Sequence, residues 1–160
     1  MKKLLVVLAA AVAVAVLAVS AAVSGGDSRT VLKFNTMAPV VPPYTGPTNP
    51  IRGVPGGGLP WVIESADGKL RSDGRLHVEV EGLVLASTGA NPSPTFKAIV
   101  SCLSSGNGTP TTVNVSTAPV PATMTGDAEI DATVALPSPC FAPIVFVTSG
   151  GGNWFAVTGR

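Results

Sequence analysis

The sequence predicts an all-β protein: an antiparallel β-sandwich with one disulfide, with an Ig-like arrangement as one form of it and a small β-barrel as the alternative. Two observations lead to this prediction. Short runs that alternate between apolar and polar residues recur from residue 59 onward, separated by Gly, Pro, Asn and Asp. No segment beyond the first 24 residues has the spacing of an amphipathic helix. The 160 residues suit a single domain.

Residues 1–24 are predicted to be an export signal. Lys2 and Lys3 form a short basic start, and residues 4–19 are an unbroken run of Leu, Val and Ala, which is typical of a signal peptide. Residues 4–23 carry no charge and are long enough to span a bilayer core of about 30 Å, so an uncleaved anchor is the alternative. In both cases we expect the rest of the chain outside the cytoplasm, secreted or at the cell surface, and in contact with a membrane only through an uncleaved N-terminal segment.

Residues 25–58 are predicted to form a Pro/Gly-rich tether. The segment contains six prolines and ends in three consecutive glycines, without a sustained periodicity. Proline extends such segments and glycine makes them flexible, so this one is expected to hold the domain away from a membrane or wall. Residues 31–34 are the one short strand expected within it.

Residues 59–160 are predicted to form the β-sandwich domain. Two Asp-Gly pairs, Asp67-Gly68 and Asp73-Gly74, favour tight turns, because glycine accepts a positive φ. Gly82 interrupts an alternating run and predicts a bulge or a bend. The expected strands cover residues 61–66, 76–81, 83–85, 95–103, 112–116, 127–136, 144–147 and 154–157.

The two cysteines, Cys102 and Cys140, are predicted to form a disulfide. Both follow the export signal, and an even number of cysteines in an oxidising compartment favours pairing. The entropy of closing the loop predicts a stabilisation of about 4 kcal/mol. Whether the bond joins two sheets or fixes a loop to a strand is left open by the spacing.

The charge and the histidine content exclude several functions. Without Lys2 and Lys3, eight Lys and Arg residues stand against nine Asp and Glu residues, so there is no basic surface for nucleic acid. His77 is the only histidine, which excludes a blue-copper site and leaves a serine nucleophile without an evident base. We expect no cofactor, and we interpret His77 as a solvent-facing side chain.

Three carboxylates are the weak candidates for a metal site. Asp127, Glu129 and Asp131 lie on one face of a predicted strand, roughly 7 Å apart. Calcium binds clustered oxygen ligands, usually from loops. The alternative is a solvated face that discourages edge-to-edge pairing.

Four aromatic residues are candidates for a contact face: Trp61, Trp154, Phe155 and Tyr44. Exposed aromatic rings are typical of surfaces that bind proteins or sugars. Only one of Trp154 and Phe155 points inward if their strand alternates, and the other is the candidate contact residue.

Residues 58–63, 78–85 and 142–148 resemble segments of small exported bacterial proteins, and this resemblance implies that residues 58–160 form one unit. It brings no catalytic motif. The leading hypothesis is a non-enzymatic surface or extracellular module that binds a protein or a glycan. The alternatives are a small secreted hydrolase or metal-dependent enzyme, and a secreted inhibitor that uses the rigid loop around Pro137 and Pro139.

Overall fold

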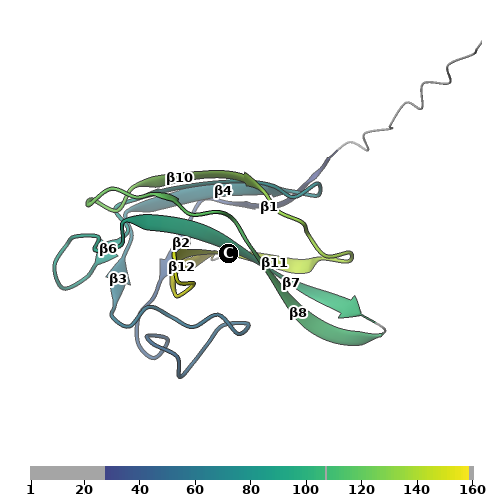
Figure 1. Ribbon diagram of the computed structural model, residues 1–160, viewed down its shortest axis with the longest axis horizontal. Helices are drawn as coiled ribbons and strands as arrows, with labels where there is room; N and C mark the ends of the chain where they lie inside the picture. Colours follow the sequence, from purple (N-terminus) through teal and green to yellow (C-terminus); the bar gives the residue numbers. More distant parts are fainter. Residues whose placement is uncertain (1–27, 107, 159–160) are drawn as a thin grey trace, which may run out of the picture.

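The computed structural model describes residues 28–106 and 108–158, and it is an all-β sandwich in which every ladder between the named strands is antiparallel (Figure 1). The predicted fold class is therefore confirmed, and the sheets do not close into the alternative barrel. The segment predicted to be an export signal, residues 1–24, lies outside the described residues. Among the residues that are described, no helix has the length and hydropathy needed to cross a bilayer.

One layer of the sandwich is a four-stranded sheet. Its strands are β1 (Thr30–Phe34), β4 (Ser65–Arg71), β5 (Arg75–Glu81) and β10 (Ala128–Thr133), in the spatial order β1-β4-β5-β10. Alternation in β5 buries Leu76, Val78 and Val80 and leaves the residues between them on the outer face. This sheet forms the upper layer in Figure 1.

The second layer is a six-stranded sheet. It comprises β2 (Met37–Pro39), β12 (Trp154–Thr158), β11 (Phe141–Ser149), β7 (Thr95–Gly106) and β8 (Thr109–Ser116) in this spatial order, with β9 (Val120–Pro121) also paired to β7. A two-stranded sheet of β3 (Trp61–Val62) and β6 (Val84–Leu85) lies at one end of the sandwich (Figure 1).

The main core lies between the two large sheets. Phe96, Val100 and Cys102 of β7 are fully buried, as the alternation predicts. Trp61 stacks on Phe155 with the ring centroids 3.8 Å apart, and Phe96 meets Phe155 edge-on at 5.8 Å. Such aromatic pairs add about 0.5–1.5 kcal/mol beyond the area they bury.

The prediction of a tether over residues 25–58 is wrong for the described part of that segment. Its first strand, β1, pairs with β4 in one sheet, and β2 pairs with β12 in the other. Val40 and Val54 are buried in the core. The prolines and glycines shape a folded segment here. The Val40 and Gly57 N–H groups donate to the carbonyls of Phe155 and Trp154, and the Gly46 and Gly56 N–H groups donate within the segment itself.

Residues 40–58 cover the outer face of the six-stranded sheet, on the side away from the four-stranded sheet (Figure 1). The Trp154 N–H donates to the Pro55 carbonyl, and the Gly57 N–H donates to the Trp154 carbonyl, each at 2.8–2.9 Å. The Arg52 guanidinium donates to the carbonyls of Ser101 and Ala142. A third layer therefore buries residues that alternation alone would leave exposed.

The predicted disulfide between Cys102 and Cys140 is confirmed, with the two Cα atoms 5.0 Å apart. Cys102 lies in β7, and Cys140 directly precedes β11, the neighbour of β7. The bond therefore fixes the start of β11 within one sheet, unlike the bridge between sheets that immunoglobulin domains have.

The predicted turn at Asp67-Gly68 is also wrong, because both residues lie in the middle of β4. Glycine is needed there for space: a Cβ atom on Gly68 would lie 2.5 Å from the Phe34 ring and 2.5 Å from the His77 carbonyl oxygen. Close packing, rather than a turn, explains this glycine. The predicted turn at Asp73-Gly74 does connect β4 to β5.

Candidate functional site

Nearly all charged side chains gather on the four-stranded sheet. Of the fifteen Lys, Arg, Asp and Glu residues within 28–106 and 108–158, thirteen lie in its strands or directly beside them, and only Arg52 and Lys97 lie elsewhere. The thirteen are Arg29, Lys33, Glu64, Asp67, Lys69, Arg71, Asp73, Arg75, Glu79, Glu81, Asp127, Glu129 and Asp131. The outer face of this sheet is therefore the charged surface of the domain.

Strand register separates these charges into rows. Lys33, Lys69 and His77 are cross-strand partners on β1, β4 and β5, and Asp131 of β10 completes their row. The next row on the same face consists of Asp67, Glu79 and Glu129, which belong to β4, β5 and β10.

The row of Asp67, Glu79 and Glu129 is a departure from ordinary sheet pairing. Cross-strand partners lie about 4.5–5.5 Å apart, and like charges directly opposite one another are destabilising. The three ion pairs found among the described residues join His77 to Asp131, His77 to Glu129 and Arg75 to Asp73. Asp67 and Glu79 therefore have no cationic partner within that part of the chain.

The row continues into an acidic groove of about 470 Å³, which we define by the five carboxylates that line it: Glu64, Glu79, Glu81, Asp127 and Glu129. Val80 and Ala128 supply the rest of its lining. Five carboxylates around one groove make it a site that attracts cations.

Asp127 is held in place at one side of the acidic groove. Its carboxylate accepts a hydrogen bond from the Gly82 N–H at 2.9 Å and from the hydroxyls of Thr125 and Thr123 at 2.7 and 3.1 Å. The Gly82 N–H, followed by the Thr125 hydroxyl, lowers the pKa of Asp127. Asp127 is therefore ionised at neutral pH and accepts the Gly82 N–H as a carboxylate.

His77 borders the groove and contacts both neighbouring carboxylates of β10. Its Nδ1 lies 2.8 Å from an Asp131 oxygen and 4.0 Å from a Glu129 oxygen. The hydrogen bond to Asp131 raises the pKa of His77. One donor atom from each of these three residues lies within 4.8 Å of the others, so they are the residues that could hold a divalent cation.

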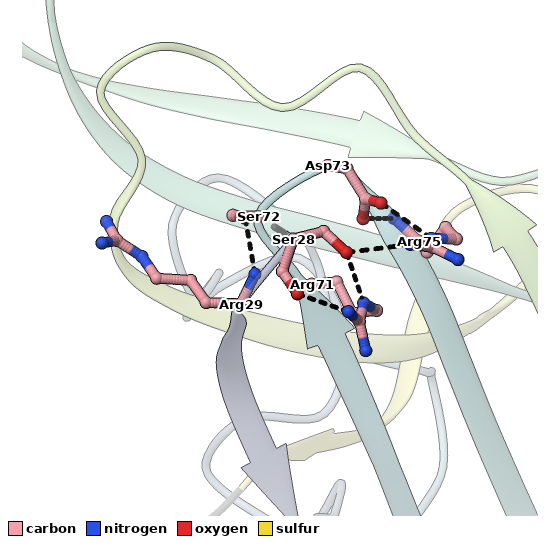
Figure 2. A network of polar contacts seen from close by, with 6 residues as sticks. All are labelled: Ser28, Arg29, Arg71, Ser72, Asp73 and Arg75. Carbon is pink, nitrogen blue, oxygen red and sulfur yellow. Dashed lines mark hydrogen bonds and ion pairs between the residues drawn. The ribbon is translucent and has the colours of Figure 1, made fainter. Parts of the chain in front are cut away.

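The opposite end of the same sheet is basic and includes the first described residues. The Ser28 hydroxyl accepts hydrogen bonds from Arg71 Nε and Arg75 Nη2, both at 2.8 Å, and the Ser28 carbonyl accepts one from Arg71 Nη2. The Arg29 N–H donates to the Ser72 hydroxyl at 3.1 Å. Figure 2 shows this network, in which the Arg29 side chain extends away from the other groups.

Of the aromatic candidates for a contact face, Trp61, Trp154 and Phe155 are wrong, because all three are less than a tenth exposed, whereas Tyr44 is 44% exposed. Trp61 and Phe155 fill the main core. Trp154 lies near Phe146, with the ring centroids 6.1 Å apart, and its strand is covered by residues 40–58 through the backbone hydrogen bonds to Pro55 and Gly57. No pattern in the sequence predicted that cover.

The three metal candidates do not act together. Glu129 and Asp131 meet His77, whereas Asp127 is hydrogen-bonded to the turn residues around it. His77 was predicted to face solvent, and its side chain is 39% exposed. Its contact with Asp131 was missed, although both strands alternate cleanly, because the sequence does not state which strands pair.

Comparisons with known protein families, with curated proteins and with solved structures find no match to this chain. The site is therefore interpreted from its own geometry.

Proposed function

We propose that the protein is an exported, non-enzymatic surface or extracellular module, and that its acidic groove binds a basic segment of a partner protein. The observation that carries this proposal is the row of Asp67, Glu79 and Glu129, three facing carboxylates of which only Glu129 is ion-paired within the described residues, to His77 of the next row. A Lys or Arg side chain from a partner would remove this repulsion on binding, so the partner gains affinity from charges that weaken the isolated sheet.

The chemistry of the groove favours a protein over a glycan as the partner. Sugar-binding surfaces generally offer an aromatic ring, and no Trp, Tyr or Phe from the described part of the chain lines this groove. Its lining is five carboxylates and two apolar residues. That composition supports ionic recognition of a basic segment rather than nucleophilic catalysis, for which a nucleophile and a base are needed together.

A binding measurement with a defined basic probe tests the proposal. A fluorescently labelled oligolysine peptide is titrated with the full chain in detergent at low salt, and its anisotropy is followed. We expect the double variant Glu79→Gln/Glu129→Gln to bind about tenfold more weakly than the parent, because each exposed ion pair contributes up to about 1 kcal/mol.

The matched control is the double variant Asp73→Asn/Asp131→Asn, which also removes two carboxylates but outside the groove. We expect it to bind within about twofold of the parent, a difference of no more than about 0.4 kcal/mol. Equal losses in both double variants would show that net charge alone attracts the peptide. No binding by the parent, or groove-dependent binding of a neutral oligosaccharide instead, would also refute the proposal.

Cross-linking on intact native cells gives the corresponding test with the natural partner. A carbodiimide joins carboxylates to amines in direct contact. We expect adducts between Glu79 or Glu129 and partner lysines, and we expect the same adducts to be lost from the Glu79→Gln/Glu129→Gln variant and retained by the Asp73→Asn/Asp131→Asn variant.

A further inference from the structure

We propose that the basic end of the sandwich docks on the surface of an anionic phospholipid bilayer. We define this N-terminal end by the first described residues, Ser28 to Val31, the β4–β5 turn and the segment that leads into β11. These three parts lie together on the right of Figure 1. Three separate features of the molecule support the inference.

The first feature is the short distance between the apolar N-terminal run and the folded domain. The uncharged run ends at residue 23, and Ser28 is already fixed by Arg71 and Arg75. Five residue steps reach at most roughly 18 Å in any conformation. When residues 4–23 span a bilayer, the N-terminal end is therefore held beside the lipid headgroups.

The second feature is a groove of about 400 Å³ with an apolar wall at this end. Val31, Leu136, Pro139 and Phe141 line it, and Arg29 lies among them. Phe141 is 60% exposed, and its cross-strand partner Leu103 is exposed as well. Exposed apolar groups beside a cation are typical of surfaces that enter the interface between water and lipid.

The third feature is the charge of this half of the four-stranded sheet. Among residues 28–106 and 108–158, it holds five cations, Arg29, Lys33, Lys69, Arg71 and Arg75, against two carboxylates, Asp73 and Asp131. The other half holds six carboxylates and no Lys or Arg among the described residues. Anionic headgroups attract the first half and repel the second, so the charges alone orient the domain on a lipid surface.

The bilayer is the occupant that fits all three features, because a lipid surface combines anionic phosphate with apolar chains and lies within reach of Ser28. This orientation places the acidic groove away from the membrane. The proposal rests on retention of the N-terminal segment, and it stands or falls independently of what the acidic groove binds.

Fluorescence quenching by brominated lipids tests the orientation with the full chain. The chain is reconstituted into vesicles of phosphatidylcholine and phosphatidylglycerol in a ratio of about 3:1, the anionic lipid supplying the surface charge. The test variant is Phe141→Trp. The control is Met124→Trp, whose parent side chain is 78% exposed in the loop that precedes β10. Trp61 and Trp154 are buried and contribute a constant background.

We expect the added emission of the Phe141→Trp variant to be quenched several-fold more strongly than that of the Met124→Trp variant. Adding Arg29→Gln to Phe141→Trp is expected to weaken the quenching, and adding Lys97→Gln is not. Equal quenching at both positions, or none at position 141, would overturn the proposal. Equal quenching of the Phe141→Trp variant in vesicles of phosphatidylcholine alone would refute the role of the anionic headgroup.

Discussion

Replacing Gly74 by alanine is expected to be among the most damaging single changes at a glycine of this domain. Gly74 lies in the β4–β5 turn with φ at +86°. Its carbonyl accepts the backbone hydrogen bond of Val134 at 3.0 Å, and its own N–H donates to the Arg71 carbonyl. A Cβ atom at position 74 would lie 1.9 Å from the Val134 carbonyl oxygen, so the two backbone segments must separate.

The size of the effect follows from two contributions. An alanine at positive φ costs about 1–2 kcal/mol. Separating the segments also breaks the bond from the Val134 N–H, and an unsatisfied group at a buried residue costs about 1–3 kcal/mol. We therefore expect Gly74→Ala to lower the free energy of unfolding by about 3 kcal/mol or more.

Gly152→Ala separates these two contributions. Gly152 has φ at +96°, and no heavy atom lies within 4 Å of its Cβ position, so only the conformational cost of about 1–2 kcal/mol applies. Both variants restrict the unfolded chain equally, and that effect cancels in the comparison. Urea titration followed by tryptophan fluorescence, with the disulfide intact, measures both free energies of unfolding. Values within about 0.5 kcal/mol of each other would refute the reasoning, because that range is expected of sites without a steric difference.

Three further predictions concern the disulfide and the titratable groups. The double variant Cys102→Ala/Cys140→Ala is expected to lose about 4 kcal/mol of unfolding free energy in urea titrations, since 37 residues separate the cysteines. Asp127→Asn is expected to destabilise the domain more at pH 7 than at pH 2. The lowered pKa of Asp127 contributes stability above the unfolded value of about 3.9, and this contribution is lost as pH falls through the folded value. The pKa of His77, measured by NMR titration, is expected to lie above its ordinary value of about 6.5 and to fall in the Asp131→Asn variant.

Each of these has a result that contradicts it. A disulfide variant as stable as the parent would mean that the bond is dispensable. If the parent and the Asp127→Asn variant differ in stability as much at pH 2 as at pH 7, the charge of Asp127 is not the cause of the difference. For His77, the raised pKa means that the contact with Asp131 stabilises the fold below the unfolded pKa of His77. This stabilisation is lost as pH rises through the folded pKa. A stability advantage of the parent over the Asp131→Asn variant that grows with rising pH would therefore refute the contact.

Alternation was a sound guide wherever a strand has one face in the main core. It predicted the inward faces of β5 and β7 and the burial of Cys102, and these are confirmed. It failed for Trp154, because a strand that is covered on both faces has no solvent-exposed face, and its residues need not alternate between apolar and polar. The third layer formed by residues 40–58 is what removes that exposed side.

The tether was predicted because proline and glycine content describes how stiff a segment is, and not whether it is paired. Long-range partners decide that question: β1 finds β4 and β2 finds β12, and neither partner lies nearby in sequence. The candidate site was hidden for the same reason. Glu129 was visible as part of an acidic stripe, but only the register places it opposite Glu79 in one row.

The pairing of β2 with β12 also orders the events of folding. Met37 to Pro39 pair with Ala156 to Thr158, more than a hundred residues later in the chain, and the six-stranded sheet is complete only when this pairing has formed. A chain made from its N-terminus therefore cannot finish the domain until its last strand is available, and contacts of such long separation form slowly. For the export that we propose, this delay is useful. On that proposal, the six-stranded sheet is completed only after β12 has crossed the membrane.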